Sequence, residues 1–418
     1  MYKKEEKIIC PSCKIELEKL LKANLVDEEK LKIFKNPRRI LEAHFPIIRD
    51  DGKIEIIEAF RVLYNGDRGP GKGGIRFHQE VNLSEVSELA FIMSLKNSLA
   101  DLDFGGAKGG VKINPRDYSK IELEKISRGY VREFFNYLGP QIDVPAPDVN
   151  TTPEIMGWMM DEYDKLAGSK NPAFITGKKI EDGGSEGRDK STAMGAFYII
   201  QERYKEVENK KEIKIAIQGF GNAGGTIAIL LHNAGYTVVA VSDSKTGIYN
   251  SEGLDIEKIY NFVYGGERKR RLSEIQDEEK ISNEKLLELE VDILIPAALG
   301  DVINFENAAQ IQAKEIVELA NGPISPRAEE ILLAKNISII PDLLANAGGV
   351  IVSVFEWEQN LKGEHWSLEE VNQKLKDKIL KAYFEVKSLA EEKELPWRLA
   401  AHKIAIDRIV EKSEIFKK

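Results

Sequence analysis

The sequence predicts an α/β protein of two domains, the second of which contains a doubly wound parallel sheet. With 418 residues, the chain exceeds the size that a single hydrophobic core usually serves. Residues 1–180 mix strand and helix patterns. The second half contains short apolar runs separated by helical stretches, at 213–217, 237–241, 291–295, 315–319 and 337–340. This alternation is typical of parallel strands joined by helices.

Composition and charge exclude several classes of protein. The chain is 42% hydrophobic and 31% charged, which is typical of a soluble globular protein, and its net charge is −9. An acidic balance argues against nucleic acid or a membrane surface as a partner, because both favour basic patches. No apolar run is long enough for a membrane-spanning helix, and the charged start of the chain does not resemble a signal peptide. We therefore expect a cytoplasmic protein.

The two cysteines, Cys10 and Cys13, have the spacing of a metal knuckle. No second cysteine pair and no nearby histidine completes a zinc site in the sequence. Two reduced thiols in a cytosolic protein are the simpler interpretation, so no metal site is predicted.

Local patterns in the first half predict one strand by alternation and three helices by capping signals and periodicity. The expected ranges are 53–64 for the strand and 82–99, 122–138 and 153–166 for the helices. An extended run lies between the last two helices. Its prolines, Pro145 and Pro147, restrict the backbone and fix the position of Asp148 in a loop.

Three lysines occupy positions where a charged side chain is costly. Lys72 and Lys108 each lie among glycines, and Lys96 lies on the apolar face of the helix between them. Glycine lets backbone and ligand approach closely, and crowded ammonium groups lower the pKa of at least one member. Such a lysine can act as a general acid or base, and three of them suit a substrate with more than one carboxylate. Alternatively, the aliphatic part of Lys96 could pack on the apolar face while its ammonium group extends to solvent.

A glycine-rich loop in the second half predicts a dinucleotide site. The pattern GxGxxG follows one apolar run and precedes a helix pattern, a context in which a tight turn brings a pyrophosphate to the helix N-terminus. The candidate cofactor-binding residues are Gly219, Phe220, Gly221, Asn222, Ala223 and Gly224. Asp243 follows the next apolar run and would accept hydrogen bonds from the adenosine ribose, which favours NAD. Ser244 and Lys245 could instead hold a 2′-phosphate, so NADP remains open.

Together these features resemble the glutamate dehydrogenases of the Glu/Leu/Phe/Val dehydrogenase superfamily, from about Arg61 to Asn360. The matching segments are RGPGKGGIRFH at 68–78, the helix of Lys96, GGAKGG at 105–110, PAPDVNT at 145–151, the loop 219–224 and NAGGVIVS at 346–353. The resemblance implies an α/β substrate-binding and oligomerisation domain made of residues 1–180 and 390–418. It also implies a Rossmann-type dinucleotide-binding domain at 181–389, and a homohexamer.

The resemblance also implies a role for each matching residue. Lys108, with a lowered pKa, and Asp148, which moves protons to and from the substrate nitrogen, would be catalytic. The implied substrate pocket has Lys72 and Ser353 on the side-chain carboxylate of glutamate, Lys96 on its α-carboxylate, and Gly73, Gly74, Ala146 and Val350 around them. The cofactor would contact Thr192 through its nicotinamide amide, Asn321 and Asn346. The implied reaction is the reversible NAD- or NADP-dependent oxidative deamination of glutamate to 2-oxoglutarate and ammonium.

Other interpretations remain. A branched-chain or aromatic amino-acid dehydrogenase on the same scaffold would replace Lys72 and Ser353 by apolar residues, because an aliphatic side chain cannot compensate a buried ammonium. A regulatory subunit that binds cofactor without turnover would not need Lys108 and Asp148. Simple structural roles are the remaining alternative: a loop cap or turn residue for Asp148 and Asp243, and caps or helix hydroxyls for Ser353, Thr192 and Asn346.

Overall fold

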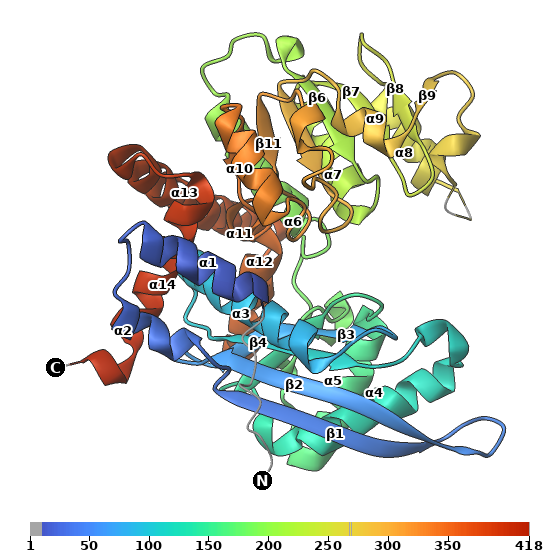
Figure 1. The fold of residues 1–418 in the computed structure, drawn as a ribbon. Helices are drawn as coiled ribbons and strands as arrows, with labels where there is room; N and C mark the ends of the chain where they lie inside the picture. Colours follow the sequence, from blue (N-terminus) through green and yellow to red (C-terminus); the bar gives the residue numbers. More distant parts are fainter. Residues whose placement is uncertain (1–10, 267, 269, 418) are drawn as a thin grey trace. The chain divides into compact units, whose positions relative to one another are not determined.

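The computed structural model describes residues 11–417 except 267 and 269, and it divides the chain into two compact units (Figure 1). The first unit comprises the chain up to Arg188 together with 350–371 and 402–418, and the second comprises 189–349 and 372–401. The boundaries expected from the sequence are 180/181 and 389/390. Cys10 lies outside the described residues, as does the side chain of Cys13. None of the helices in the described ranges is both long enough and apolar enough to cross a membrane.

The first unit is built on a mixed sheet of five strands in the order β1-β2-β4-β3-β5. β1 and β4 each pair with β2 in antiparallel orientation, whereas β3 runs parallel to both β4 and β5. The strands are β1 (Arg39–Ile48), β2 (Ile54–Asn65), β3 (Gly71–Phe77), β4 (Gly106–Val111) and β5 (Asp143–Pro147). β2 confirms the strand expected over 53–64.

The helices of this unit include the three that the sequence predicts, and those three contact the sheet. The helices of the unit are α1 (Pro11–Lys22), α2 (Glu28–Leu31), α3 (Leu83–Leu99), α4 (Lys120–Phe134), α5 (Pro153–Ala167), most of α12 (Gly348–Lys362) and the larger part of α14 (Trp397–Lys412). Ile75 and Phe77 of β3 pack into one core with Ile126 of α4 and Met159 of α5. Asn82 caps α3 by accepting a hydrogen bond from the Glu85 amide, as the sequence predicts.

The second unit contains a seven-stranded sheet in the order β12-β11-β10-β6-β7-β8-β9. The five strands from β12 to β7 are parallel, which confirms the doubly wound sheet, and β8 and β9 add an antiparallel edge. The strands are β6 (Lys214–Gln218), β7 (Thr237–Ser242), β8 (Gly247–Tyr249), β9 (Glu279–Ile281), β10 (Ile293–Pro296), β11 (Glu315–Val317) and β12 (Ser338–Ile340). The edge was not predicted, because β8 and β9 are only three residues long.

Some helices of this unit connect consecutive strands and others precede or follow the sheet in the chain, and Figure 1 shows α7 and α10 beside the sheet. The helices of the unit are α6 (Ser191–Arg203), α7 (Asn222–Asn233), α8 (Ile256–Tyr264), α9 (Asn283–Leu287), α10 (Pro326–Ala334), α11 (Asp342–Ala345) and most of α13 (Leu368–Lys393). The chain passes from β6 to β7 on one side and later places β10 on the other side of β6. Such a reversal of strand order is where open α/β sheets bind dinucleotides, at the carboxyl ends of the strands.

Candidate active site and cofactor site

Lys108 and Asp148 form an ion pair in the first unit, with 2.8 Å between Nζ and Oδ2. Lys108 lies in β4, and Asp148 directly follows β5, so the two residues come from the two neighbours of β3. Arg76 of β3 donates from Nε to the same carboxylate at 3.1 Å. Burial raises the pKa of Asp148, but the charges of Lys108 and Arg76 outweigh it and hold the pKa below its usual value.

Two glycines allow this approach of strands. A Cβ at Gly74 would lie 2.8 Å from the Cβ of Asp148, and a Cβ at Gly73 would lie 1.7 Å from the carbonyl oxygen of Ala107. Both distances are too short for any side chain. The glycines beside Lys72 therefore let the segments that carry Asp148 and Lys108 close on β3, and Ala146 of β5 pairs with Gly74.

Lys72, also in β3, is buried and only 1% exposed. Its Nζ donates a hydrogen bond to Thr176 Oγ1 at 2.7 Å, and the same hydroxyl lies 2.7 Å from Ser353 Oγ on α12. The structure thus brings Lys72 and Ser353 together, as expected, but through a third residue. Thr176 is not predictable from the sequence, because a lone threonine beside one glycine belongs to no recognisable motif.

A buried ion pair holds Thr176 in this position. Lys178 Nζ lies 2.7 Å from Glu356 Oε1, and both side chains are completely buried. Glu356 Oε2 also accepts a hydrogen bond from the Gly177 amide at 2.7 Å. Because Glu356 and Ser353 lie one turn apart on α12, these bonds fix the segment 175–178 beside Ser353.

Burial lowers the pKa of Lys72 well below its ordinary value, and the positive charges of Arg188 and Arg61 lower it further against the opposing effect of Glu356. The sequence indicates crowded lysines as the cause of a lowered pKa, whereas the main causes in the structure are burial and the two arginines. Lys96 is buried on α3, as the periodicity predicts, with 7% of its surface exposed. Val350, at the start of α12, is half-buried.

The glycine loop of the second unit has the geometry of a pyrophosphate site. Gly219 follows β6 with φ of +102°, a conformation that favours glycine. A Cβ at Gly224 would lie 1.8 Å from the Gly219 carbonyl oxygen, so the loop packs tightly against the first turn of α7. A Cβ at Gly221, the residue that precedes α7, would meet nothing within 4 Å. Open space therefore lies beside the free amides of the helix N-terminus, where a phosphate is favoured.

A cavity of about 710 Å³ lies along this loop and can hold the adenosine half of a dinucleotide. It is lined by Gln218, Gly219, Phe220, Gly221, Asp243, Ser244, Val263, Arg270, Arg271, Leu272, Asn283, Ala297, Ala298 and Leu299. Asp243 Oδ1 accepts hydrogen bonds from the amides of Lys245 and Thr246, and Oδ2 accepts one from the amide of Leu272. The Asp243 carboxylate thus lines the cavity, as expected, and it also stabilises the backbone at 245–246 and at Leu272.

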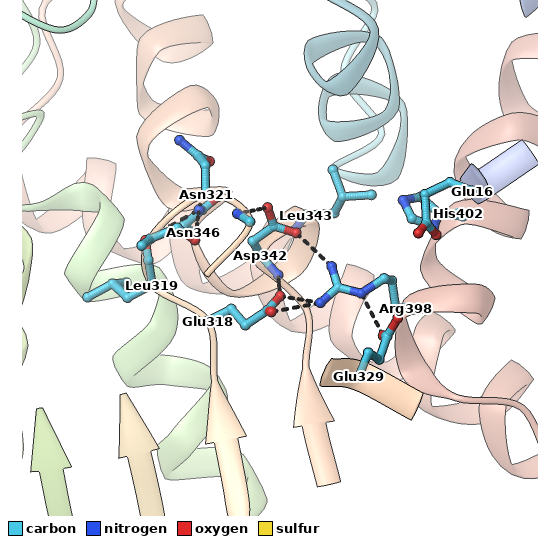
Figure 2. Close-up of polar contacts among 12 residues, drawn as sticks. Glu16, Glu318, Leu319, Asn321, Glu329, Asp342, Leu343, Asn346, Arg398 and His402 are labelled. Atoms are coloured by element: carbon cyan, nitrogen blue, oxygen red, sulfur yellow. Dashed lines mark hydrogen bonds and ion pairs between the residues drawn. The ribbon is translucent and has the colours of Figure 1, made fainter. Parts of the chain in front are cut away.

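The remaining predicted cofactor residues lie at the carboxyl ends of β11 and β12 and at the start of α6. Asn346 Nδ2 lies 3.0 Å from Asn321 Oδ1 and also bonds the carbonyls of Leu319 and Ala320 (Figure 2). Thr192 lies in the first turn of α6. A Cβ at Gly348 would lie 2.0 Å from the carbonyl oxygen of the adjacent Ser191, so α6 begins against the segment that follows Asn346.

One cluster in the described residues has the geometry for a metal ion. Glu42, His44 and Glu58 can place three ligand atoms within 4.8 Å of one another on β1 and β2. The two β1 residues are exposed, and Glu58 already pairs with Lys112 at 3.0 Å. Exposed acidic groups of this kind are common without a metal, so the cluster carries no assignment.

Comparison with known proteins gives consistent matches over nearly the whole chain. Residues 37–165 match the Glu/Leu/Phe/Val dehydrogenase dimerisation domain, and residues 183–415 match the Glutamate/Leucine/Phenylalanine/Valine dehydrogenase domain. The NADP-specific glutamate dehydrogenase of Synechocystis sp. is 43% identical over 94% of both chains. The NAD-specific glutamate dehydrogenase of Staphylococcus aureus is 43% identical over 92% of both.

Solved structures agree with these matches. The hetero-hexameric glutamate dehydrogenase of Thermus thermophilus superposes with a TM-score of 0.90 at 33% identity and covers 99% of each chain. The glutamate dehydrogenase of Peptoniphilus asaccharolyticus gives a TM-score of 0.85 at 34% identity, covering 97% of this chain and 98% of the other. The chain belongs to the Glu/Leu/Phe/Val dehydrogenase family.

Proposed function

We propose that the chain is a glutamate dehydrogenase, which catalyses the reversible NAD- or NADP-dependent oxidative deamination of L-glutamate to 2-oxoglutarate and ammonium. The observation that carries this proposal is the buried group of Lys72, Thr176 and Ser353. A buried ammonium with a lowered pKa becomes charged and stable when an anion joins it, and the side-chain carboxylate of glutamate is such an anion. A leucine or phenylalanine side chain would leave the ammonium uncompensated. The glutamate dehydrogenases among the relatives support the same substrate.

The arrangement of Lys108 and Asp148 supports the chemical step. A nicotinamide cofactor held by the second unit would supply the acceptor for a hydride from the α-carbon of the substrate. Asp148 stays ionised at neutral pH because its pKa is lowered, so it can take a proton from the substrate nitrogen and return one in the reverse direction. Lys108, 2.8 Å away, stabilises the Asp148 carboxylate and orients the water that adds to the iminium carbon.

The proposal includes NADP as a substrate beside NAD. Arg270 and Arg271 line the same cavity as Asp243. Lys280 Nζ donates a hydrogen bond to the Leu272 carbonyl at 3.0 Å. The Lys280 ammonium is therefore a third positive charge near the Asp243 carboxylate. A 2′-phosphate carries a charge near −2 and would meet the guanidinium groups, whereas the ribose of NAD would use the remaining acceptor capacity of Asp243.

A homohexamer in the cytoplasm is also part of the proposal. Ile48 and Ile54 pair across β1 and β2, and Ile56 pairs with Pro46 on the same face. Ile48, Ile54 and Ile56 are 60%, 72% and 58% exposed. Large aliphatic side chains gathered on one sheet face are typical of a protein interface, and a second copy of the chain would cover them. Light scattering after gel filtration tests this: a hexamer is expected, and an Ile54→Lys variant should form smaller species.

The direct test of the function is oxidative deamination by the purified protein, with glutamate, leucine, valine and phenylalanine each offered with NAD and with NADP. We expect turnover of glutamate alone among the four. Turnover of leucine or phenylalanine would mean that Lys72 does not face the substrate side chain. Cofactor binding without turnover of any of the four would favour a regulatory subunit.

A further inference from the structure

Arg398, near the start of α14, is surrounded by three buried carboxylates of the second unit (Figure 2). Its Nη2 lies 2.7 Å from both side-chain oxygens of Glu318, and its Nε lies 2.7 Å from Glu329 Oε1. Its Nη1 lies 3.2 Å from Asp342 Oδ1. All of these side chains are buried or nearly so, with 11% of the arginine exposed and none of Glu318. One planar guanidinium thus satisfies three acids by direct hydrogen bonds.

Two of these acids, Glu318 and Asp342, lie beyond the carboxyl ends of β11 and β12, near the predicted cofactor residues Asn321 and Asn346. Glu318 follows β11, and Asp342 begins α11 after β12. Glu318 Oε2 accepts a hydrogen bond from the Asp342 amide at 2.8 Å, which ties the ends of the two strands together. Asp342 Oδ2 in turn accepts one from the Gly322 amide at 3.0 Å. Gly322 is the residue next to Asn321. The Asp342 carboxylate therefore links Arg398 to the backbone beside this asparagine.

The same loop is held from its other side by Asn346, which follows α11. Its side-chain Nδ2 donates to the carbonyls of Leu319 and Ala320 and to Asn321 Oδ1. The Asn346 backbone amide bonds the Asp342 carbonyl at 3.2 Å. The segment 319–322 is therefore fixed between Asp342, the first residue of α11, and Asn346, the residue that follows α11.

Electrostatics makes this arrangement depend on the arginine. Three acids in one buried site are costly to desolvate when they are ionised. Burial, together with the charge of Asp342, raises the pKa of Glu318 to about 8, and the charge of Arg398 opposes this increase, so the guanidinium favours the ionised form of Glu318. Without the guanidinium, Glu318 and Asp342 would lose a hydrogen-bond donor and move, or Glu318 would become more fully protonated. Either change would release the hydrogen bonds that fix the loop of Asn321.

We propose that Arg398 is a positioning residue for the nicotinamide end of the cofactor site. It acts through Asp342 and Glu318 on Asn321 and Asn346 and does not itself touch the cofactor. This inference rests on the proposed function for the cofactor contacts of the two asparagines. It goes beyond that function in assigning the geometry of these contacts to an arginine from the C-terminal helix.

The test compares Arg398→Lys with Asn321→Ala and with the double variant in the full-length protein. A lysine keeps a positive charge but cannot bond three carboxylates in one plane. We expect each single variant to raise the dissociation constant for reduced cofactor, measured by nicotinamide fluorescence, at least tenfold. The dissociation constant of the double variant should be no higher than that of the weaker-binding single variant, because both changes disturb the same contact. The KM for glutamate should change less than twofold.

Glu329→Gln is the matched control, since Glu329 bonds the arginine but belongs to α10 rather than to the loop or α11. It should leave the dissociation constant within twofold of wild type, and thermal unfolding of every variant measures the purely structural effect. Two results would overturn the proposal. One is an unchanged cofactor affinity in Arg398→Lys, and the other is a double variant whose increase in dissociation constant equals the product of the two single increases. Binding is measured without glutamate, so a failure of the proposed substrate would appear separately, as wild-type protein that binds cofactor without turning over glutamate.

Discussion

Lys72 of β3 and Ser353 of α12 meet at one hydroxyl group, that of Thr176, which lies 2.7 Å from each. The shared hydroxyl fixes the ammonium and the serine relative to each other before any substrate arrives. We expect Thr176→Val to lower kcat/KM for glutamate by about 10- to 100-fold, since a buried partner lost from a charged group costs about 1–3 kcal/mol. Steady-state kinetics with glutamate measures this.

A threonine of the second unit supplies the control for that experiment. Thr237 Oγ1 donates to the Lys211 carbonyl at 2.7 Å. Thr237→Val should keep wild-type kinetics. If Thr176→Val also did so, the hydroxyl would have no part in binding the substrate carboxylate.

The burial of Lys72 gives a prediction about stability and pH. Its pKa in the folded protein lies below the ordinary value of 10.5, so between these two values the unfolded chain binds more protons and the free energy of unfolding rises with pH. Lys72→Met removes the buried charge. We expect the variant to be more stable than wild type by about 1–4 kcal/mol at pH values below the folded pKa. The difference should shrink as the pH rises toward 10.5.

Urea unfolding of both proteins across this pH range measures the difference, and glutamate turnover by the variant should be lost. The variant also predicts a ligand effect: glutamate should stabilise wild type against urea but not Lys72→Met. A stability difference that stayed constant with pH would show that Lys72 does not titrate in the folded protein.

The ion pair of Lys108 and Asp148 predicts a loss of turnover without a loss of cofactor binding. Lys108→Ala and Asp148→Asn should each lower kcat by about 10²- to 10⁴-fold, the usual contribution of general acid–base catalysis. Cofactor affinity, read by nicotinamide fluorescence, should remain that of wild type. Lys112→Ala is the control, because Lys112 follows the same strand but pairs with Glu58. Normal turnover by Lys108→Ala would exclude a catalytic role.

The arginines in the cavity beside Asp243 give a prediction about how the protein distinguishes NAD from NADP. Arg270 and Arg271 line the cavity of Asp243, and Arg270 also stacks on Phe262 at 4.9 Å. We expect Arg270→Ala/Arg271→Ala to raise the KM for NADP by about tenfold or more, since hydrogen bonds to charged groups contribute about 1.5–3 kcal/mol. The KM for NAD should stay within about twofold. An equal increase in KM for NAD and for NADP would show that the two arginines do not contact the 2′-phosphate of the adenosine ribose.

Local signals in the sequence determined much of this protein. Alternation over 53–64, the cap at Asn82 and the glycine loop at 219–224 each depend on residues that are neighbours in the chain. Such signals fix hydrogen bonds and backbone conformations within one element, and the corresponding strand, helix cap and βα turn are all present. Lys72 and Lys108 indicate the candidate site of the first unit for the same reason, because the glycines on either side of each lysine are visible in the sequence.

Only the tertiary structure decided the partners of those residues. Thr176 reaches Lys72, Arg398 joins Glu318 to Asp342, and Arg270 lies at the cavity of Asp243, although nothing in their own segments marks them. Hydrogen bonds and charge pairs act over a few ångströms in space, whereas periodicity and capping act over a few residues of chain. Contacts between distant segments follow from how strands and helices pack, and packing is a property of the whole fold.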